Sequence, residues 1–244
     1  MLNVYIPLIW FMSSLLNGIT SFGGNLLGIP LVSMFLEPRE AIVMGCATGA
    51  VMTLSLGLIY RHSLPKLEFV VITLTSIVGT YLGSFVLQRA PSGLLLICAG
   101  VVLACFLLWQ FVSRRLHFSV NLPLWSMFPA GILHGFVQGA TGMGGPVLAI
   151  YTLLRNWDKE TTISTLNLSA AISLGVLAFN QWRDGLYTSN IVELLPIGMT
   201  GSIVGSLVSV LVVRRLRTEV FKKIMLLMLC VFTVVLLSRG TMML

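Results

Sequence analysis

Two short runs of glycine, amide and hydroxyl residues have the composition of a binding site for a small solute. Residues 17–24 read NGITSFGG and residues 138–145 read QGATGMGG, so each run combines an amide side chain, a threonine and a Gly-Gly step. Glycine tolerates backbone angles that interrupt a helix, and it lets a ligand approach the main chain closely. A helix that begins after such an interruption presents unpaired N–H groups and the positive end of its dipole, which favour an anion.

Both runs lie in a chain that is too apolar to be water-soluble. Of its 244 residues, 57% are hydrophobic and 9% are charged, and the mean hydropathy is +0.97. Because soluble domains carry about a quarter charged residues, this composition excludes a water-soluble enzyme, a disordered chain and a nucleic-acid-binding protein. The net charge of +7 comes from short basic clusters between apolar runs, as in the cytoplasmic loops of membrane proteins. The composition predicts a polytopic membrane protein.

Cysteine usage indicates neither a disulfide framework nor a metal site. All four cysteines lie inside apolar runs without paired spacing: Cys46, Cys98, Cys105 and Cys230. Cysteines in such runs behave as small hydrophobic residues. We expect no metal and no cofactor.

Hydropathy divides the chain into ten apolar stretches. They are 3–22, 26–36, 41–60, 69–88, 93–112, 123–140, 146–154, 161–180, 191–213 and 220–238. A helix of about 20 residues crosses a hydrocarbon core of about 30 Å, and eight stretches are long enough or nearly so. The other two, 26–36 and 146–154, reach only about halfway. The first stretch lacks the features of a cleaved signal peptide, and we expect it to be retained.

The chain contains an internal duplication. Beyond the two glycine runs, two further pairs of segments align in the same order at a nearly constant offset: 60–64 with 182–186, and 79–84 with 201–206. The repeat unit is two segments around a Gly-Gly break followed by three full spans. We therefore predict one integral membrane domain made of a first repeat, 1–116, and a second repeat, 117–244.

The basic residues indicate how the two repeats are oriented. If the chain continued straight through each Gly-Gly step, the 15 Lys and Arg would divide six against nine between the two sides. If the chain turns back there, the second repeat is inverted and the basic residues divide eleven against four. The side with four holds Arg39, Arg89, Arg183 and Arg239. The positive-inside rule favours this second arrangement. The expected fold is an all-α polytopic membrane protein of two inverted repeats of five segments, with a short broken helix in each and both termini outside the cytoplasm.

The absence of charge within the apolar stretches favours an anion or a neutral solute. No Asp, Glu, Lys or Arg lies in the middle of a stretch, whereas a cation carrier generally needs an intramembrane carboxylate. Inverted repeats with broken helices are typical of secondary transporters, whose substrate site lies near the midplane. The candidate substrate-binding residues are the glycines of the two breaks and the polar residues near them: Asn17, Thr20, Gly23, Gly24, Asn25, Thr48, Gln138, Thr141, Gly144, Gly145, Asn167 and Ser169.

Other notable residues have simpler explanations. Small-xxx-small glycine pairs in membrane helices usually mark close helix packing, which is our interpretation of Gly45, Gly79 and Gly201 and their partners four residues later. His134 lies well within an apolar stretch; we favour a buried histidine with a local hydrogen bond over a proton relay. Arg61 and Arg183 occupy matched positions at segment ends, where snorkelling anchors are usual.

The glycine-rich openings of the two halves resemble a known family. Residues 18–30 (GITSFGGNLLGIP), repeated as 139–148 (GATGMGGPVL), resemble the TauE/SafE family of sulfite exporters and sulfonate permeases over essentially the whole chain. The resemblance implies a bacterial-type transporter in the plasma (inner) membrane for small sulfur-containing anions such as sulfite, sulfonates or sulfoacetate. Two departures stand out: Asn25 replaces an expected small or apolar residue, and Pro30 has Tyr151 as its counterpart, so the halves are not chemically equivalent.

The expected function is secondary transport of such anions, as an exporter or permease working by alternating access, without enzymatic activity. The expected partners are the small anion and the lipid bilayer, with no nucleic acid. The oligomeric state stays open, a homodimer included. A channel-like passive pore for small anions or neutral solutes is the alternative. An intramembrane enzyme, or a membrane subunit of a larger complex, is less compatible, because His134 near a serine is the only catalytic combination available.

Overall fold

The computed structural model describes residues 2–115, 122–213 and 218–243. Within these ranges the chain forms α-helices and two short 3₁₀ helices, and no strand. The helices of the first half are α1 (Leu2–Thr20), α2 (Gly24–Val32), α3 (Pro38–Ile59), η1 (Arg61–Ser63), α4 (Lys66–Arg89) and α5 (Ser92–Arg115). Those of the second half are η2 (Leu124–Ser126), α6 (Met127–Thr141), α7 (Gly145–Leu154), α8 (Lys159–Arg183), α9 (Ser189–Val213) and α10 (Thr218–Met242). The predicted all-α class is confirmed.

Most of these helices have the length and composition of membrane spans. Within the described residues, six helical segments are long and apolar enough to cross a bilayer: Leu2–Thr20, Pro38–Ile59, Lys66–Arg89, Ser92–Trp109, Lys159–Arg183 and Ser189–Leu211. Large apolar side chains such as Val4, Leu108 and Leu211 remain more than 60% exposed, which suits a surface that faces lipid. These findings confirm a polytopic membrane protein.

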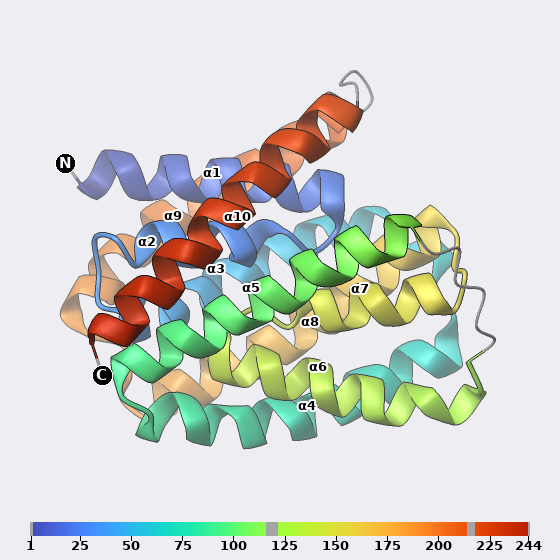
Figure 1. Cartoon of the computed structure of the whole chain (residues 1–244), viewed down its shortest axis with the longest axis horizontal. Helices are drawn as coiled ribbons and strands as arrows, with labels where there is room; N and C mark the ends of the chain where they lie inside the picture. Colours follow the sequence, from blue (N-terminus) through green and yellow to red (C-terminus); the bar gives the residue numbers. More distant parts are fainter. Residues whose placement is uncertain (1, 116–121, 214–217, 244) are drawn as a thin grey trace.

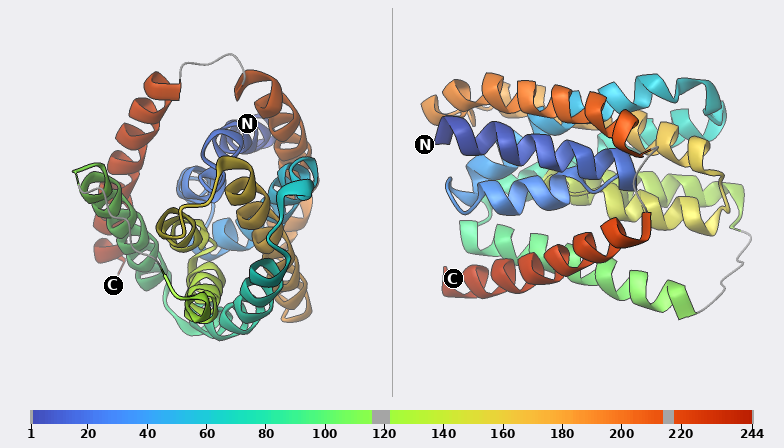
Figure 2. Two further views of the ribbon diagram at one scale, coloured as in Figure 1. Left: turned by 90° about the vertical axis from the view of Figure 1, so that its right-hand side faces the viewer. Right: turned by 90° about the horizontal axis from the view of Figure 1, so that it is seen from above.

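The two halves pack on each other through equivalent helices. The first helix of each half pairs with the fourth helix of the other, so that α1 packs against α9 and α6 against α4. The third helices, α3 and α8, pair with each other at the centre, and the last helices, α5 and α10, pair along one side (Figure 2).

Glycine makes the α1–α9 and α4–α6 contacts possible. A Cβ atom added at Gly79 or Gly83 would overlap backbone carbonyl groups of α6, and one at Gly201 or Gly205 would overlap those of α1. Only glycine lets the helix axes approach this closely. The interpretation of these pairs as packing contacts is confirmed.

The chain turns back at each break. Figure 1 shows that α2 returns toward the end of the molecule where α1 began, and that α7 does the same after α6. Helices α1 and α6 run in opposite directions, and both termini lie at the same end of the molecule (Figure 1). The connection between α3 and α4 and the one between α7 and α8 lie together at the other end (Figure 2). The two short helices therefore begin in the interior of the helical bundle.

Candidate functional site

Two interruptions of the helical backbone form the centre of the molecule. After α1, Ser21 adopts a positive φ of 73°, and after α6, Gly142 adopts a φ of 74°. The N–H of Gly142 closes the end of α6 on the carbonyl of Gln138 at 2.7 Å. A residue with positive φ stops a right-handed helix, which is why each helix ends here; Gly142 adopts this conformation without steric cost, whereas Ser21 does so against the preference of a residue with a side chain.

A threonine stabilises each interruption. The Thr20 hydroxyl donates to the carbonyl of Leu16 at 2.9 Å and accepts the N–H of Gly23 at 2.9 Å. In the second half, Thr141 donates to the carbonyl of Val137 and accepts the N–H of Met143 at 3.3 Å. The two threonines predicted as substrate ligands thus bind the backbone of their own breaks, and they fix its course.

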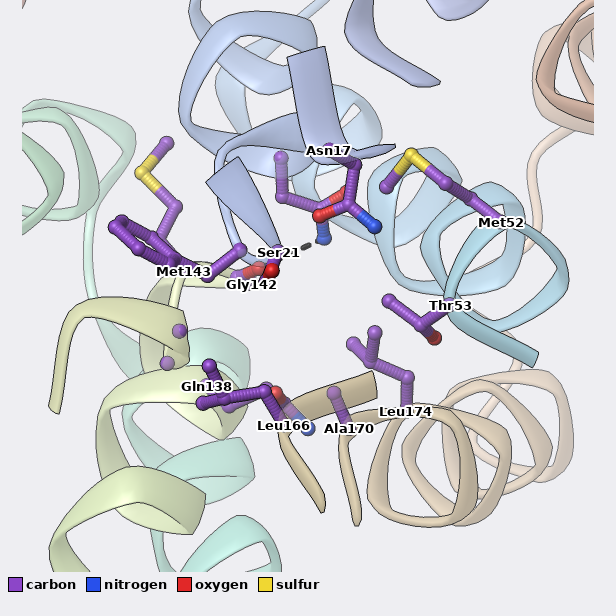
Figure 3. A pocket seen from close by; sticks show the side chains of 14 residues that line it. Asn17, Ser21, Met52, Thr53, Gln138, Gly142, Met143, Leu166, Ala170 and Leu174 are labelled. Carbon is purple, nitrogen blue, oxygen red and sulfur yellow. Dashed lines mark hydrogen bonds between the residues drawn. The ribbon is translucent and has the colours of Figure 1, made fainter. Parts of the chain in front are cut away.

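A cavity lies between the two breaks and the central helices α3 and α8 (Figure 3). The space open to the centres of water-sized spheres is about 30 Å³, which is room for a few water molecules. Asn17 and Gln138, at matched positions of the two halves, approach it from opposite sides (Figure 3). The residues that line it come from both halves: Asn17, Ser21, Phe22, Asn25, Met52, Thr53, Gln138, Gly142, Met143, Gly144, Gly145, Leu166, Ala170 and Leu174.

Five of the twelve sequence-predicted site residues line this cavity: Asn17, Asn25, Gln138, Gly144 and Gly145. Asn167 stands directly behind the wall, where its Oδ1 accepts the Nδ2–H of Asn17 at 2.9 Å. Gly23 and Gly24 form the first break, packed against Thr20 and the Met52 side chain respectively.

The remaining predicted residues, Thr48 and Ser169, are fully buried outside the cavity wall. Thr48 donates to the carbonyl of Met44 at 2.8 Å, and Ser169 shares a hydrogen bond of 3.0 Å with Thr73 on α4. The Thr48 hydroxyl therefore stays within its own helix, α3, whereas the Ser169 hydroxyl connects α8 to α4.

Several lining residues were not predicted from the sequence. Ser21, Phe22, Gly142 and Met143 lie inside the aligned glycine runs, so the alignment itself could have identified them. The others come from the facing sides of α3 and α8: Met52, Thr53, Leu166, Ala170 and Leu174. Four of these side chains are apolar and the Thr53 hydroxyl bonds to its own helix, so none carries a signal that distinguishes a cavity wall from ordinary helix packing.

Amide side chains tie the first break to helix α8. Asn17 Oδ1 accepts the N–H of Gly24 at 3.4 Å, and the Asn167 Nδ2 group donates to the carbonyl of Ser21 at 3.1 Å. On the opposite wall, Gln138 Nε2 donates to the Ser173 hydroxyl at 2.6 Å. Because Asn17, Asn167 and Gln138 are at least 98% buried, these bonds fix the wall in a low-dielectric environment.

Asn25 joins the two breaks to each other. Its Nδ2 group donates to the carbonyl of Gly142 in the second break at 2.8 Å and to the carbonyl of Gly45 on α3 at 3.1 Å. This residue departs from the family pattern expected at its position, and an apolar residue could make neither bond.

His134 supports the second break from behind. Its side chain is fully buried, and Nδ1 lies 3.0 Å from the carbonyl oxygen of Gly144. Because a carbonyl only accepts, Nδ1 must carry the hydrogen. The expectation of a buried histidine with a local hydrogen bond is confirmed.

The electrostatic character of the cavity comes from backbone dipoles. None of the described residues that line it is charged. Helix α7 starts at the cavity wall, at Gly145, and α2 starts at Gly24, next to the lining residue Asn25. The first N–H groups of a helix have no acceptor within the helix. Within the described residues, no three His, Cys, Asp or Glu side chains are grouped so that they could hold a metal ion.

An ion pair holds the far end of α7. Arg155, directly after α7, forms an ion pair with Glu68 in the first turn of α4 at 2.5 Å, and it also donates to the carbonyl of Leu122 at 2.9 Å. Tyr151 donates to the same carboxylate at 3.4 Å. The hydrogen bond to Glu68 raises the pKa of Arg155, so the guanidinium stays charged. This cluster fastens the short helix of the second half to the first half.

The fold and the site together define a class of protein. A polytopic helical membrane protein with an uncharged cavity, lined by both polar and apolar residues, between two interrupted helices has the architecture of a secondary transporter. The sequence matches the family model of the sulfite exporter TauE/SafE over residues 6–236. The chain therefore belongs to the TauE/SafE family, whose members are membrane transporters of sulfite or related anions. No curated protein and no solved structure matches the chain.

Proposed function

We propose that the protein is a secondary transporter that carries small sulfur-containing anions, such as sulfite or organosulfonates, by alternating access through the cavity between the two breaks. The observation that carries this proposal is the convergence of both interruptions, one from each half, on one cavity that the amides Asn17, Asn25 and Gln138 help to line. Such a site can bind a solute in the interior and can open when the halves move relative to each other.

The chemistry of the cavity wall supports an anionic substrate. The N–H groups at the starts of α2 and α7 give positive potential where no basic side chain is present. A fixed cation would hold an anion strongly and slow its release, whereas helix dipoles and amide groups bind more weakly. The wall also offers no carboxylate that would neutralise a metal cation or an organic ammonium ion.

The small volume supports an alternating mechanism over an open pore. A space of about 30 Å³ holds a few water molecules, and an organosulfonate requires the walls to move apart. We interpret this arrangement as a closed state of the transport cycle.

The two halves are proposed to be inverted repeats, residues 1–116 and 117–244. The exchange of equivalent helix partners between the halves, with α1 on α9 and α6 on α4, supports this relation. Among the described residues, the end of the molecule opposite the termini carries more Lys and Arg than the other end, including Arg61, Lys66, Arg155 and Lys159. By the positive-inside rule we assign that end to the cytoplasm of a plasma (inner) membrane, with both termini outside.

Flux measurements in reconstituted vesicles test the proposal. Sulfite or sulfonate efflux is expected to saturate with concentration and to be lost in Gly24→Val and Gly145→Val, since both substitutions fill a break. The control is Gly175→Val, because a Cβ at Gly175 on α8 meets no atom within 4 Å. Normal flux in both break variants would exclude this site, and a flux linear in concentration would indicate a passive pore.

A further inference from the structure

The orientation of the Asn25 amide is fixed by its surroundings. Its Nδ2 group donates both hydrogens to protein acceptors, the carbonyl oxygens of Gly142 at 2.8 Å and Gly45 at 3.1 Å. If the amide were turned over, its oxygen would face these two carbonyl oxygens without a hydrogen between them. Nitrogen and oxygen are therefore assigned by the network, and neither hydrogen is available to a ligand.

The amide oxygen of Asn25 is left as an acceptor without a donor. Asn25 lines the cavity, and its Oδ1 is itself enclosed in this closed arrangement and makes no hydrogen bond with any donor among the described residues. A buried acceptor without a donor is unfavourable, and a bound ligand that supplies a hydrogen removes the penalty. The same amide sits flat against Gly49, so it has little freedom to turn away.

The first turn of α2 carries both kinds of group, backbone donors and this side-chain acceptor. The backbone N–H groups of Asn25 and Leu26 precede the first intrahelical bond of α2, which runs from the N–H of Leu27 to Gly23 at 3.3 Å. These N–H groups suit the oxygens of an anion. The Asn25 oxygen suits a hydrogen on the same ligand and repels an anionic oxygen placed against it.

We infer that the transport site selects monoanions that carry their own hydrogen-bond donor, such as hydrogen sulfite or an amino- or hydroxyl-bearing sulfur oxyanion. Fully ionised dianions and donor-free sulfonates bind more weakly. This inference rests on the proposed function and adds the protonation state and donor requirement of its substrate.

Sulfamate and methanesulfonate provide a matched pair of probes. Both are monoanions at neutral pH with the same tetrahedral –SO₃⁻ group, and they differ only in an amino group against a methyl group. Competition with sulfite flux in reconstituted vesicles, and thermal stabilisation of the purified protein, are measured for each. Sulfamate is expected to compete at least about tenfold better, the effect of supplying a donor to a buried acceptor.

A variant pair connects this preference to the amide. Asn25→Ala is expected to reduce the advantage of sulfamate to within about twofold, while Asn190→Ala, at an exposed asparagine at the start of α9, retains it. If Asn25→Ala does not insert, the ratio for the wild-type protein decides alone.

The outcomes separate this inference from the proposed function. Sulfite flux with no advantage of sulfamate over methanesulfonate overturns the donor requirement and leaves the proposed function in place. The absence of any flux of sulfite, sulfamate or methanesulfonate overturns both.

Discussion

The contact between the two breaks is sensitive to a single methyl group. A Cβ atom at Gly145 would lie 2.7 Å from the Cβ of Phe22 and 3.0 Å from its carbonyl oxygen. Both distances are shorter than van der Waals contact, and the atoms belong to the backbone and the first side-chain carbon of the opposite break, which cannot rotate away. The substitution Gly145→Ala must therefore push the two breaks apart.

The cost can be estimated from overpacking. Inserting a methyl group into a packed interior typically costs about 1–3 kcal/mol. At about 1.4 kcal/mol for each factor of ten, this corresponds to a loss of about 5- to 150-fold in substrate affinity or flux. We expect this loss in the apparent affinity for sulfite, measured as the concentration dependence of flux into vesicles with equal amounts of inserted protein.

Two other glycines are the matched comparisons. A Cβ at Gly24 would meet the sulfur and terminal methyl of Met52, which can rotate aside, so Gly24→Ala is expected to lose less. Gly175→Ala meets no atom within 4 Å, and alanine at a helical position stabilises by about 0.4–1 kcal/mol with no change in flux. Equal flux in Gly145→Ala and Gly175→Ala would refute the conclusion that close contact between the breaks shapes the site.

Three further predictions follow from the described contacts. Asn17→Ala removes two buried hydrogen bonds from the cavity wall, and we expect a loss of about 1–3 kcal/mol in stability. The loss is measured as a lower thermal unfolding temperature in detergent, and an unchanged temperature would show that these hydrogen bonds do not stabilise the wall. Glu68→Gln removes the charge partner of Arg155, and we expect the free energy of unfolding to fall by about 1 kcal/mol. A double variant that exchanges the two residues is expected to restore that stability. In a background without native cysteines, His62→Cys and Arg183→Cys are expected to react with an impermeant thiol reagent from opposite sides of the membrane; labelling from one side would exclude inverted repeats.

Hydropathy and the duplicated motifs determined most of the helical architecture. The short stretch predicted at 146–154 corresponds closely to α7 (Gly145–Leu154), and the stretch at 26–36 corresponds to α2 (Gly24–Val32), displaced by a few residues. This agreement is expected, since apolar length and glycine position are local properties that lipid and backbone geometry constrain directly. A span predicted at 123–140 was less accurate, because the chain there forms η2 before α6 begins at Met127.

The sequence identified where a site could form, and the tertiary structure decided which side chains face it. The Gly-Gly steps and the amides Asn17, Asn25 and Gln138 could be recognised as polar groups in apolar segments without any contact information. The burial of Thr48 outside the cavity wall, and the entry of Ala170 and Leu174 into that wall, depend on how α3 and α8 rotate against each other. Rotation of a helix about its axis is set by packing with its neighbours, which no single segment encodes.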